Sequence, residues 1–118
     1  MRLVSRICGV FVIAMLLGAC AQKPQRLLFV VPEQLPGGEA STQQQAELEE
    51  WMARQAGGFT RINGVEGGWV TPEGKLLREH NVLYLLSLPP GVPESLASEL
   101  EGRILADFEQ QEAWIQRW

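Results

Sequence analysis

A turn between two apolar segments constrains the fold of this chain more than any other feature. Residues 71–74 (Thr-Pro-Glu-Gly) combine a proline, which fixes φ at the second position, with a glycine that accepts positive φ. The segment that follows, residues 82–88, is apolar almost throughout and ends at Pro89-Pro90-Gly91. It is too short for an isolated helix. The pattern therefore predicts a strand buried on both faces, the second arm of a hairpin whose first arm carries Trp69 and Val70.

The first twenty residues have the pattern of an export signal. Arg2 and Arg6 precede an apolar run over residues 7–17, which is shorter than the ~20 residues that a membrane-spanning helix needs. The run ends at Leu17-Gly18-Ala19-Cys20, which resembles the lipobox of bacterial lipoproteins. The resemblance implies that residues 1–19 are a signal peptide and that Cys20 is acylated, palmitate included, and becomes the first mature residue. An ordinary signal peptide or a short anchor helix is the alternative.

The residues after Cys20 bear on location and domain organisation. By resemblance to envelope lipoproteins, Ala21 in place of aspartate implies sorting to the periplasmic face of the outer membrane rather than to the inner membrane. Residues 20–25 form a tether of at most about 20 Å, which would hold the domain close to the membrane. Residues 26–118 have the length of a single domain with one core.

Charge and cysteine content exclude several classes of function. The full chain has a net charge of −4. Without Arg2 and Arg6, eight basic side chains remain against fourteen acidic ones, a net charge near −6, so nucleic-acid binding is not expected. Cys8 leaves with the signal and Cys20 becomes a thioether, which leaves no thiol for a disulfide, a metal site or a nucleophile. With one histidine in the chain, we predict no metal site and no cofactor.

Five further elements complete a β-α-β-β-α-β order. Ser41 with Gln44, or Thr42 with Gln45, has the spacing of a capping box and predicts the start of the first helix. The predicted elements are a strand at 26–31, a helix at 41–56, a strand at 59–70, a helix at 93–108 and a last strand at 113–118.

This order predicts an α+β, ferredoxin-like fold: an antiparallel four-stranded sheet with two helices on one face. The first and third strands are the most apolar, so we expect them to lie at the centre, where we expect them to pair in parallel. Because both central strands are continuously apolar, we also expect the open face of the sheet to be covered, either by a partner subunit or by tryptophan side chains.

The titratable residues give little indication of catalysis. His80, the only histidine, lies next to Glu79 and close to Tyr84. Neighbouring residues on a strand point to opposite faces, so Glu79 and His80 cannot form a dyad directly. A solvated histidine at the start of a strand is the favoured interpretation, and an enzyme is the less favoured one.

The tryptophans are the stronger candidates for a binding surface. Trp51 lies on the apolar face of the first helix and is predicted to be core. Trp69, Trp114 and Trp118 lie on predicted edge strands. Exposed together, they would form a platform for a sugar ring, an aromatic ligand or a protein partner. Packed inward, they would cover the sheet, which is the interpretation that we favour at this point.

A second resemblance rests on Gly68-Trp69, Gly74-Lys75 and Glu79 before an apolar strand. This pattern resembles small bacterial proteins, many of them lipoproteins, of a domain family of unknown function with a predicted ferredoxin-like fold. The likeness covers most of residues 26–108. It implies no activity, and it marks Trp69, Arg78 and Glu79 as positions to test. Arg78 and Glu79 can also be only a surface ion pair.

Together these features predict a non-enzymatic envelope lipoprotein, anchored in the membrane by its lipid, whose domain binds an envelope protein partner or forms a homodimer. The interaction would use a sheet edge or the open sheet face. The alternative is a small-ligand-binding or enzymatic domain of the dimeric ferredoxin-like type, with a pocket near His80 that Arg78, Glu79 or Tyr84 would line.

Overall fold

The computed structural model describes residues 25–117. The predicted signal peptide, Cys20, the first residues of the tether and Trp118 lie outside this range. The elements are β1 (Gln25–Pro32), α2 (Thr42–Ala56), β2 (Thr60–Val70), β3 (Leu76–Leu88), α3 (Ser95–Asp107) and β4 (Ile115–Arg117). The third strand therefore begins six residues earlier than its apolar run, and the last strand is shorter than predicted.

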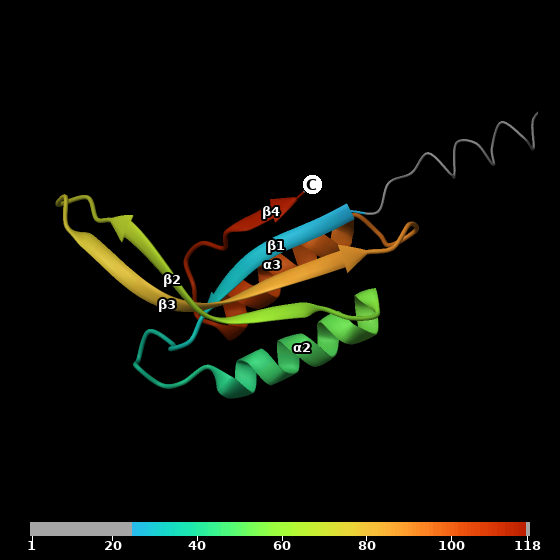
Figure 1. Ribbon diagram of the computed structural model, residues 1–118, viewed down its shortest axis with the longest axis horizontal. Helices are drawn as coiled ribbons and strands as arrows, with labels where there is room; N and C mark the ends of the chain where they lie inside the picture. Colours follow the sequence, from blue (N-terminus) through green and yellow to red (C-terminus); the bar gives the residue numbers. More distant parts are fainter. Residues whose placement is uncertain (1–24, 118) are drawn as a thin grey trace, which may run out of the picture.

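The four strands form one sheet in the order β2-β3-β1-β4 (Figure 1). Every neighbouring pair is antiparallel, which confirms the ferredoxin-like α+β fold. The expected parallel pairing of the first and third strands is wrong. The connection through α2 returns the chain parallel to β1 but one place removed, and the tight hairpin then reverses β3 into the gap between β1 and β2.

A single core lies between the sheet and the two helices. Leu27, Phe29 and Val31 of β1 are fully buried. They belong to one cluster with residues of both helices, among them Met52 of α2 and Leu100 of α3. The helices also contact each other, since the Arg103 guanidinium of α3 lies 4.7 Å from the ring centroid of Trp51 in α2. Trp51 is 8% exposed, as its place on the helix predicts.

Within residues 25–117 the central strands are buried on one face only, and cover of the other face by a partner subunit stays a prediction. In β1 and β3, fully buried residues alternate with half-buried ones. Leu28, Val30, Leu83 and Leu85 are the half-buried apolar residues. The sequences of β1 and β3 are as apolar as those of strands covered on both faces. No element among residues 25–117, however, covers these four side chains.

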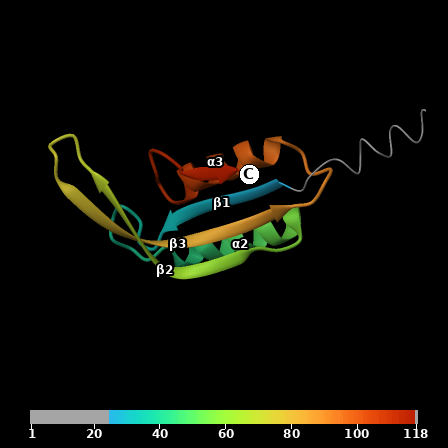
Figure 2. The same cartoon turned by 45° about the horizontal axis from the view of Figure 1, so that its top comes forward.

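The β2–β3 hairpin projects beyond the rest of the sheet (Figures 1 and 2). Asn81–Leu88 of β3 pair with β1, whereas residues 76–80 pair only with residues 66–70 of β2. The turn at its end is the predicted one: the Gly74 amide donates to the Thr71 carbonyl at 2.8 Å, and Gly74 has φ of +84°. β2 is irregular at one point, where its register with β3 shifts between Ile62 and Val65.

The start of α2 differs from the predicted capping box. The Ser41 side chain makes no cap hydrogen bond to the helix. Its hydroxyl instead donates to the Pro32 carbonyl at 2.6 Å and accepts a hydrogen bond from Gln45 Nε2 at 2.8 Å. Ser41 thus fastens α2 to the end of β1, a contact distant in sequence that the capping pattern does not specify.

Tyr84, which the sequence placed at the rim of a pocket, is a core residue. It is fully buried and stacks on Phe29 with a centroid separation of 5.4 Å. Its hydroxyl has no hydrogen-bond partner among the described residues. Burial, together with the negative charge of Glu49, raises the pKa of the Tyr84 hydroxyl above its usual range.

We predict that Tyr84→Phe raises the free energy of unfolding at pH 7 by up to about 1 kcal/mol, because a buried hydroxyl without a partner is unfavourable. The effect should grow above pH 10. Above pH 10 the tyrosine of the unfolded chain loses its proton, whereas that of the native protein keeps it. The free energy of unfolding of the wild type therefore falls as pH rises, and that of the variant does not fall for this reason. Urea unfolding at pH 7 and pH 11 measures both.

Tyr84 is the only tyrosine in the chain, so its ionisation can be followed directly by absorbance at 295 nm. The native protein should show no ionisation at pH 10, whereas the urea-unfolded protein should be half ionised there. Half ionisation of the native protein at pH 10 would contradict this account of the core.

Candidate functional site

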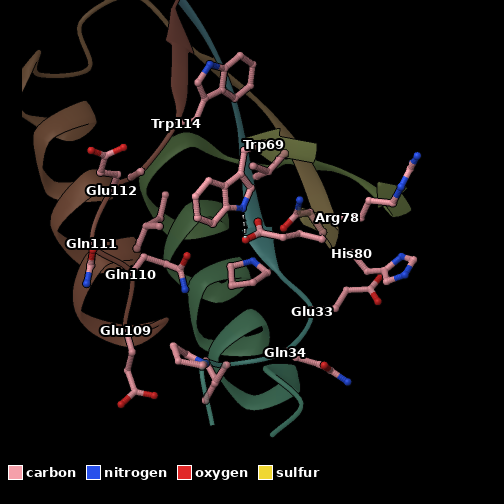
Figure 3. Close-up of a pocket in the computed structure, with 18 residues that line it drawn as sticks. Glu33, Gln34, Trp69, Arg78, His80, Glu109, Gln110, Gln111, Glu112 and Trp114 are labelled. Carbon is pink, nitrogen blue, oxygen red and sulfur yellow. Dashed lines mark hydrogen bonds between the residues drawn. The ribbon is translucent and has the colours of Figure 1, made fainter. Parts of the chain in front are cut away.

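A groove of about 1010 Å³ lies where the projecting hairpin leaves the sheet (Figure 3). Its lining comes from the end of β1 and the loop after it, from the hairpin, and from the segment between α3 and β4. Five sequence-predicted candidates line it: Trp69, Arg78, Glu79, His80 and Trp114. The antiparallel register brings the first four together, and the return of the chain after α3 adds Trp114.

Trp69 is held in place by Glu79. The indole Nε1 donates to Glu79 Oε1 at 3.0 Å, from one strand of the hairpin to the other (Figure 3). Trp69 remains 47% exposed. The expectation that Trp69 packs inward over the sheet is therefore wrong, and its ring stands at the groove in a fixed orientation.

Arg78 and His80 point away from Trp69 (Figure 3). Arg78 Nη1 lies 2.7 Å from Glu66 Oε1, so Arg78 pairs across the hairpin with Glu66 and not with its neighbour Glu79. The His80 side chain is exposed, as predicted. Glu79 and His80 lie on opposite faces of the strand, as their adjacency requires, and they form no dyad.

Asn81 is a groove residue that the sequence did not reveal. It is only 6% exposed and lines the groove. None of the side-chain hydrogen bonds formed among residues 25–117 involves its amide. The amide nitrogen lies close to Gly67, where an added Cβ would come within 3.1 Å of it. The only signal in the sequence was a polar residue at the start of an apolar run.

Trp114 lies at the other rim of the groove and is 53% exposed (Figure 3). It directly precedes β4, whose first residue, Ile115, packs against the core. The inward packing expected for Trp114 is thus also wrong. Trp118 lies outside the described residues.

The charged lining of the groove is mostly acidic. Glu33, Glu79, Glu109 and Glu112 line it. The ion pairs formed among residues 25–117 involve Glu49, Glu50 and Glu66 and none of these four. Residues 25–117 contain no group of three or more histidine, cysteine, aspartate or glutamate side chains arranged to hold a metal ion.

A second surface lies on the open face of the sheet. Ile62 pairs with Leu83, Leu83 with Val30, and Leu85 with Leu28, so these side chains form two adjoining apolar rows. We call Leu28, Val30, Ile62, Leu83 and Leu85 the open-face patch. Ile62 is 50% exposed. Val30 also lines the groove, so the patch and the groove adjoin.

Comparison with solved structures shows the same fold in CutA1 proteins. The divalent cation tolerance protein CutA1 from Thermus thermophilus has a TM-score of 0.59 at 13% identity, over 81% of this chain and 82% of that one. CutA1 from Oryza sativa has a TM-score of 0.54 at 18% identity, over 80% and 77%. CutA from Xylella fastidiosa has a TM-score of 0.57 at 11% identity, over 82% and 83%. At these identities the likeness establishes the fold.

No protein-family model and no curated protein sequence matches the chain. Among residues 25–117, no helix is long and apolar enough to cross a membrane.

The two cross-element ion pairs should differ in strength. Arg78 and Glu66 are 70% and 47% exposed, whereas Arg61 and Glu49 are 32% and 19% exposed. We predict a coupling energy under about 1 kcal/mol for Arg78–Glu66 and a larger one for Arg61–Glu49, because solvent screens the exposed pair more strongly. Double-mutant cycles to alanine, measured by urea unfolding, give both values. The reverse order would contradict the exposure argument.

Proposed function

We propose that this protein is a non-enzymatic, lipid-anchored protein of the cell envelope whose domain self-associates through the open-face patch. The observation that carries the proposal is the composition of this face. One apolar row, Val30, Leu83 and Ile62, runs across β1, β3 and β2, and a second, Leu28 and Leu85, runs across β1 and β3. No element among residues 25–117 covers them. An apolar face of this kind is typical of a surface that is buried in an assembly.

A second copy is the occupant that best suits the patch. The patch is apolar and lies on the face of an antiparallel sheet, so it can pack face to face against itself about a two-fold axis. Stable interfaces bury about 800 Å² per partner, which the face of a four-stranded sheet can supply. The acidic side chains Glu33, Glu109 and Glu112 lie at the groove and outside the patch, so a homodimer would not oppose them directly.

The predicted anchor favours the same association. Acylation at Cys20 would place all copies in one membrane, at the periplasmic face of the outer membrane if Ala21 determines the sorting. A tether of about 20 Å would hold every domain at a similar height. Confinement of this kind raises the effective concentration of one copy around another, so a patch of moderate affinity would be sufficient.

The names of the CutA1 proteins raise divalent-cation binding as a second candidate function. Its support is the shared fold, and residues 25–117 contain no group of three or more histidine, cysteine, aspartate or glutamate side chains arranged to hold a metal ion. Measuring self-association with and without EDTA or a divalent cation distinguishes the two candidate functions. Association through apolar side chains should not change when either is added. Isothermal titration of the full chain with Cu²⁺, Zn²⁺ and Mg²⁺ tests the second candidate directly.

We predict that Ile62→Glu abolishes self-association and that Val70→Glu does not. Both residues are exposed apolar residues of β2, at 50% and 63%, and neither substitution empties the core. Only Ile62 belongs to the patch, where a charge would be buried at the interface. In-cell formaldehyde cross-linking of the full chain should give an adduct of two copies in the wild type and in Val70→Glu, and none in Ile62→Glu.

Mass spectrometry of the adduct decides between self-association and its alternatives. A wild type without an adduct, or an adduct lost in Val70→Glu instead, would contradict the proposal. An adduct whose added mass belongs to a different protein would also contradict it, and would assign the patch to an envelope partner. Thermal unfolding by circular dichroism controls for the folding of both variants.

A further inference from the structure

One face of the projecting hairpin gathers polar and aromatic groups that neither the fold nor the open-face patch uses. Along β2, Gly67 and Trp69 lie on this face, and along β3 it carries Glu79 and Asn81. Gly67 pairs with Glu79, and the absence of a side chain at Gly67 leaves room for the Asn81 amide. All but Gly67 line the groove (Figure 3).

Asn81 points to a ligand with hydrogen-bonding groups. An amide has two donor protons and an acceptor oxygen, which hydroxyl or amide groups of a ligand can pair with. Asn81 is only 6% exposed and belongs to none of the side-chain hydrogen bonds among the described residues. Among the described residues the buried polar atoms without a partner are Gln44 Oε1 and Tyr84 Oη, so the Asn81 amide reaches the solvent of the groove, where a ligand can replace the water that it bonds.

Trp69 supplies a flat apolar surface beside that amide. Its bond to Glu79 fixes the plane of the ring, and about half of the side chain remains exposed. A ring that is already fixed loses little conformational entropy when a ligand stacks on it. Trp114 at the opposite rim offers a second indole.

The charge of the groove excludes one broad class of ligands. Four carboxylates line it, and the one arginine in the lining is engaged with Glu66. An anionic ligand would therefore meet a negative potential. Carboxylates and amides such as Glu79, Gln34 and Gln110 are, however, good acceptors for hydroxyl groups.

We propose that this groove binds an uncharged sugar ring, with Trp69 stacked on its apolar face and the Asn81 amide paired with its hydroxyl or acetamido groups. A pyranose has an apolar C–H face and a polar edge, and the groove offers one surface for each. An apolar protein segment would leave the Asn81 amide and the carboxylates buried without partners, at a cost that the exposed indoles would not offset. The site adjoins the open-face patch, with which it shares Val30, and it goes beyond the proposed self-association.

The experiment is isothermal titration of the full chain in detergent micelles with an N-acetylglucosamine tetramer as the uncharged probe. A galacturonic acid tetramer is the anionic probe. We expect binding of the first and none of the second. Trp69→Ala should weaken binding about tenfold or more, as loss of a stacking surface does, and Trp69→Phe should recover part of the loss. Asn81→Ala should weaken binding as well.

The matched control is Leu76→Ala, which truncates an exposed apolar residue of the same hairpin that does not line the groove. It should bind the probe as the wild type does. Because Asn81 is buried, its variant is interpreted only if its thermal unfolding matches the wild type, and the exposed Trp69 carries the test otherwise. No binding of the uncharged probe, tighter binding of the anionic one, or equal binding by wild type and Trp69→Ala would each overturn the proposal.

The two proposals fail separately. Ile62→Glu should lose the cross-linked adduct and keep the sugar affinity, whereas Trp69→Ala should keep the adduct and lose the affinity. Loss of sugar binding in Ile62→Glu, with its fold intact, would overturn the assignment of the sugar site to the groove alone.

Discussion

The antiparallel pairing of β1 with β3 is the interaction on which the rest of this structure depends. It runs over all eight residues of β1 and places Leu27, Phe29 and Val31 beside Leu86, Tyr84 and Val82 on the buried face. Both helices pack on the layer that these side chains form. The same pairing aligns Leu28 and Val30 with Leu85 and Leu83 on the other face, so the open-face patch follows from the register of the core.

The groove arises because β3 is longer than β1, its neighbour at the centre of the sheet. Where β1 ends at Pro32, β3 continues toward the turn with β2 as its only neighbour. The hairpin, the loop after β1 and the segment before β4 therefore meet around a space that no element among the described residues fills. Polar side chains such as Asn81 and Glu79 are placed there by strand alternation.

Much of the fold follows from local patterns, and the site does not. The turn at Gly74, the order of elements and the burial of Trp51 were all predictable from residue type and spacing. Burial on both faces was predicted from continuous apolarity, yet that signal cannot tell a covered face from an uncovered one. The bond between Trp69 and Glu79 and the burial of Asn81 depend on the hairpin register and on a distant loop, which composition does not specify.

The irregularity in β2 between Ile62 and Val65 has a consequence for the edge of the sheet. β2 is an edge strand of eleven residues, and a regular edge of that length can add strands from further molecules without limit. At the register shift the backbone turns through Gly64, with φ of +69°, which interrupts the row of outward amides and carbonyls. The edge is thereby a poor template for filaments, and the proposed self-association would use the face of the sheet instead.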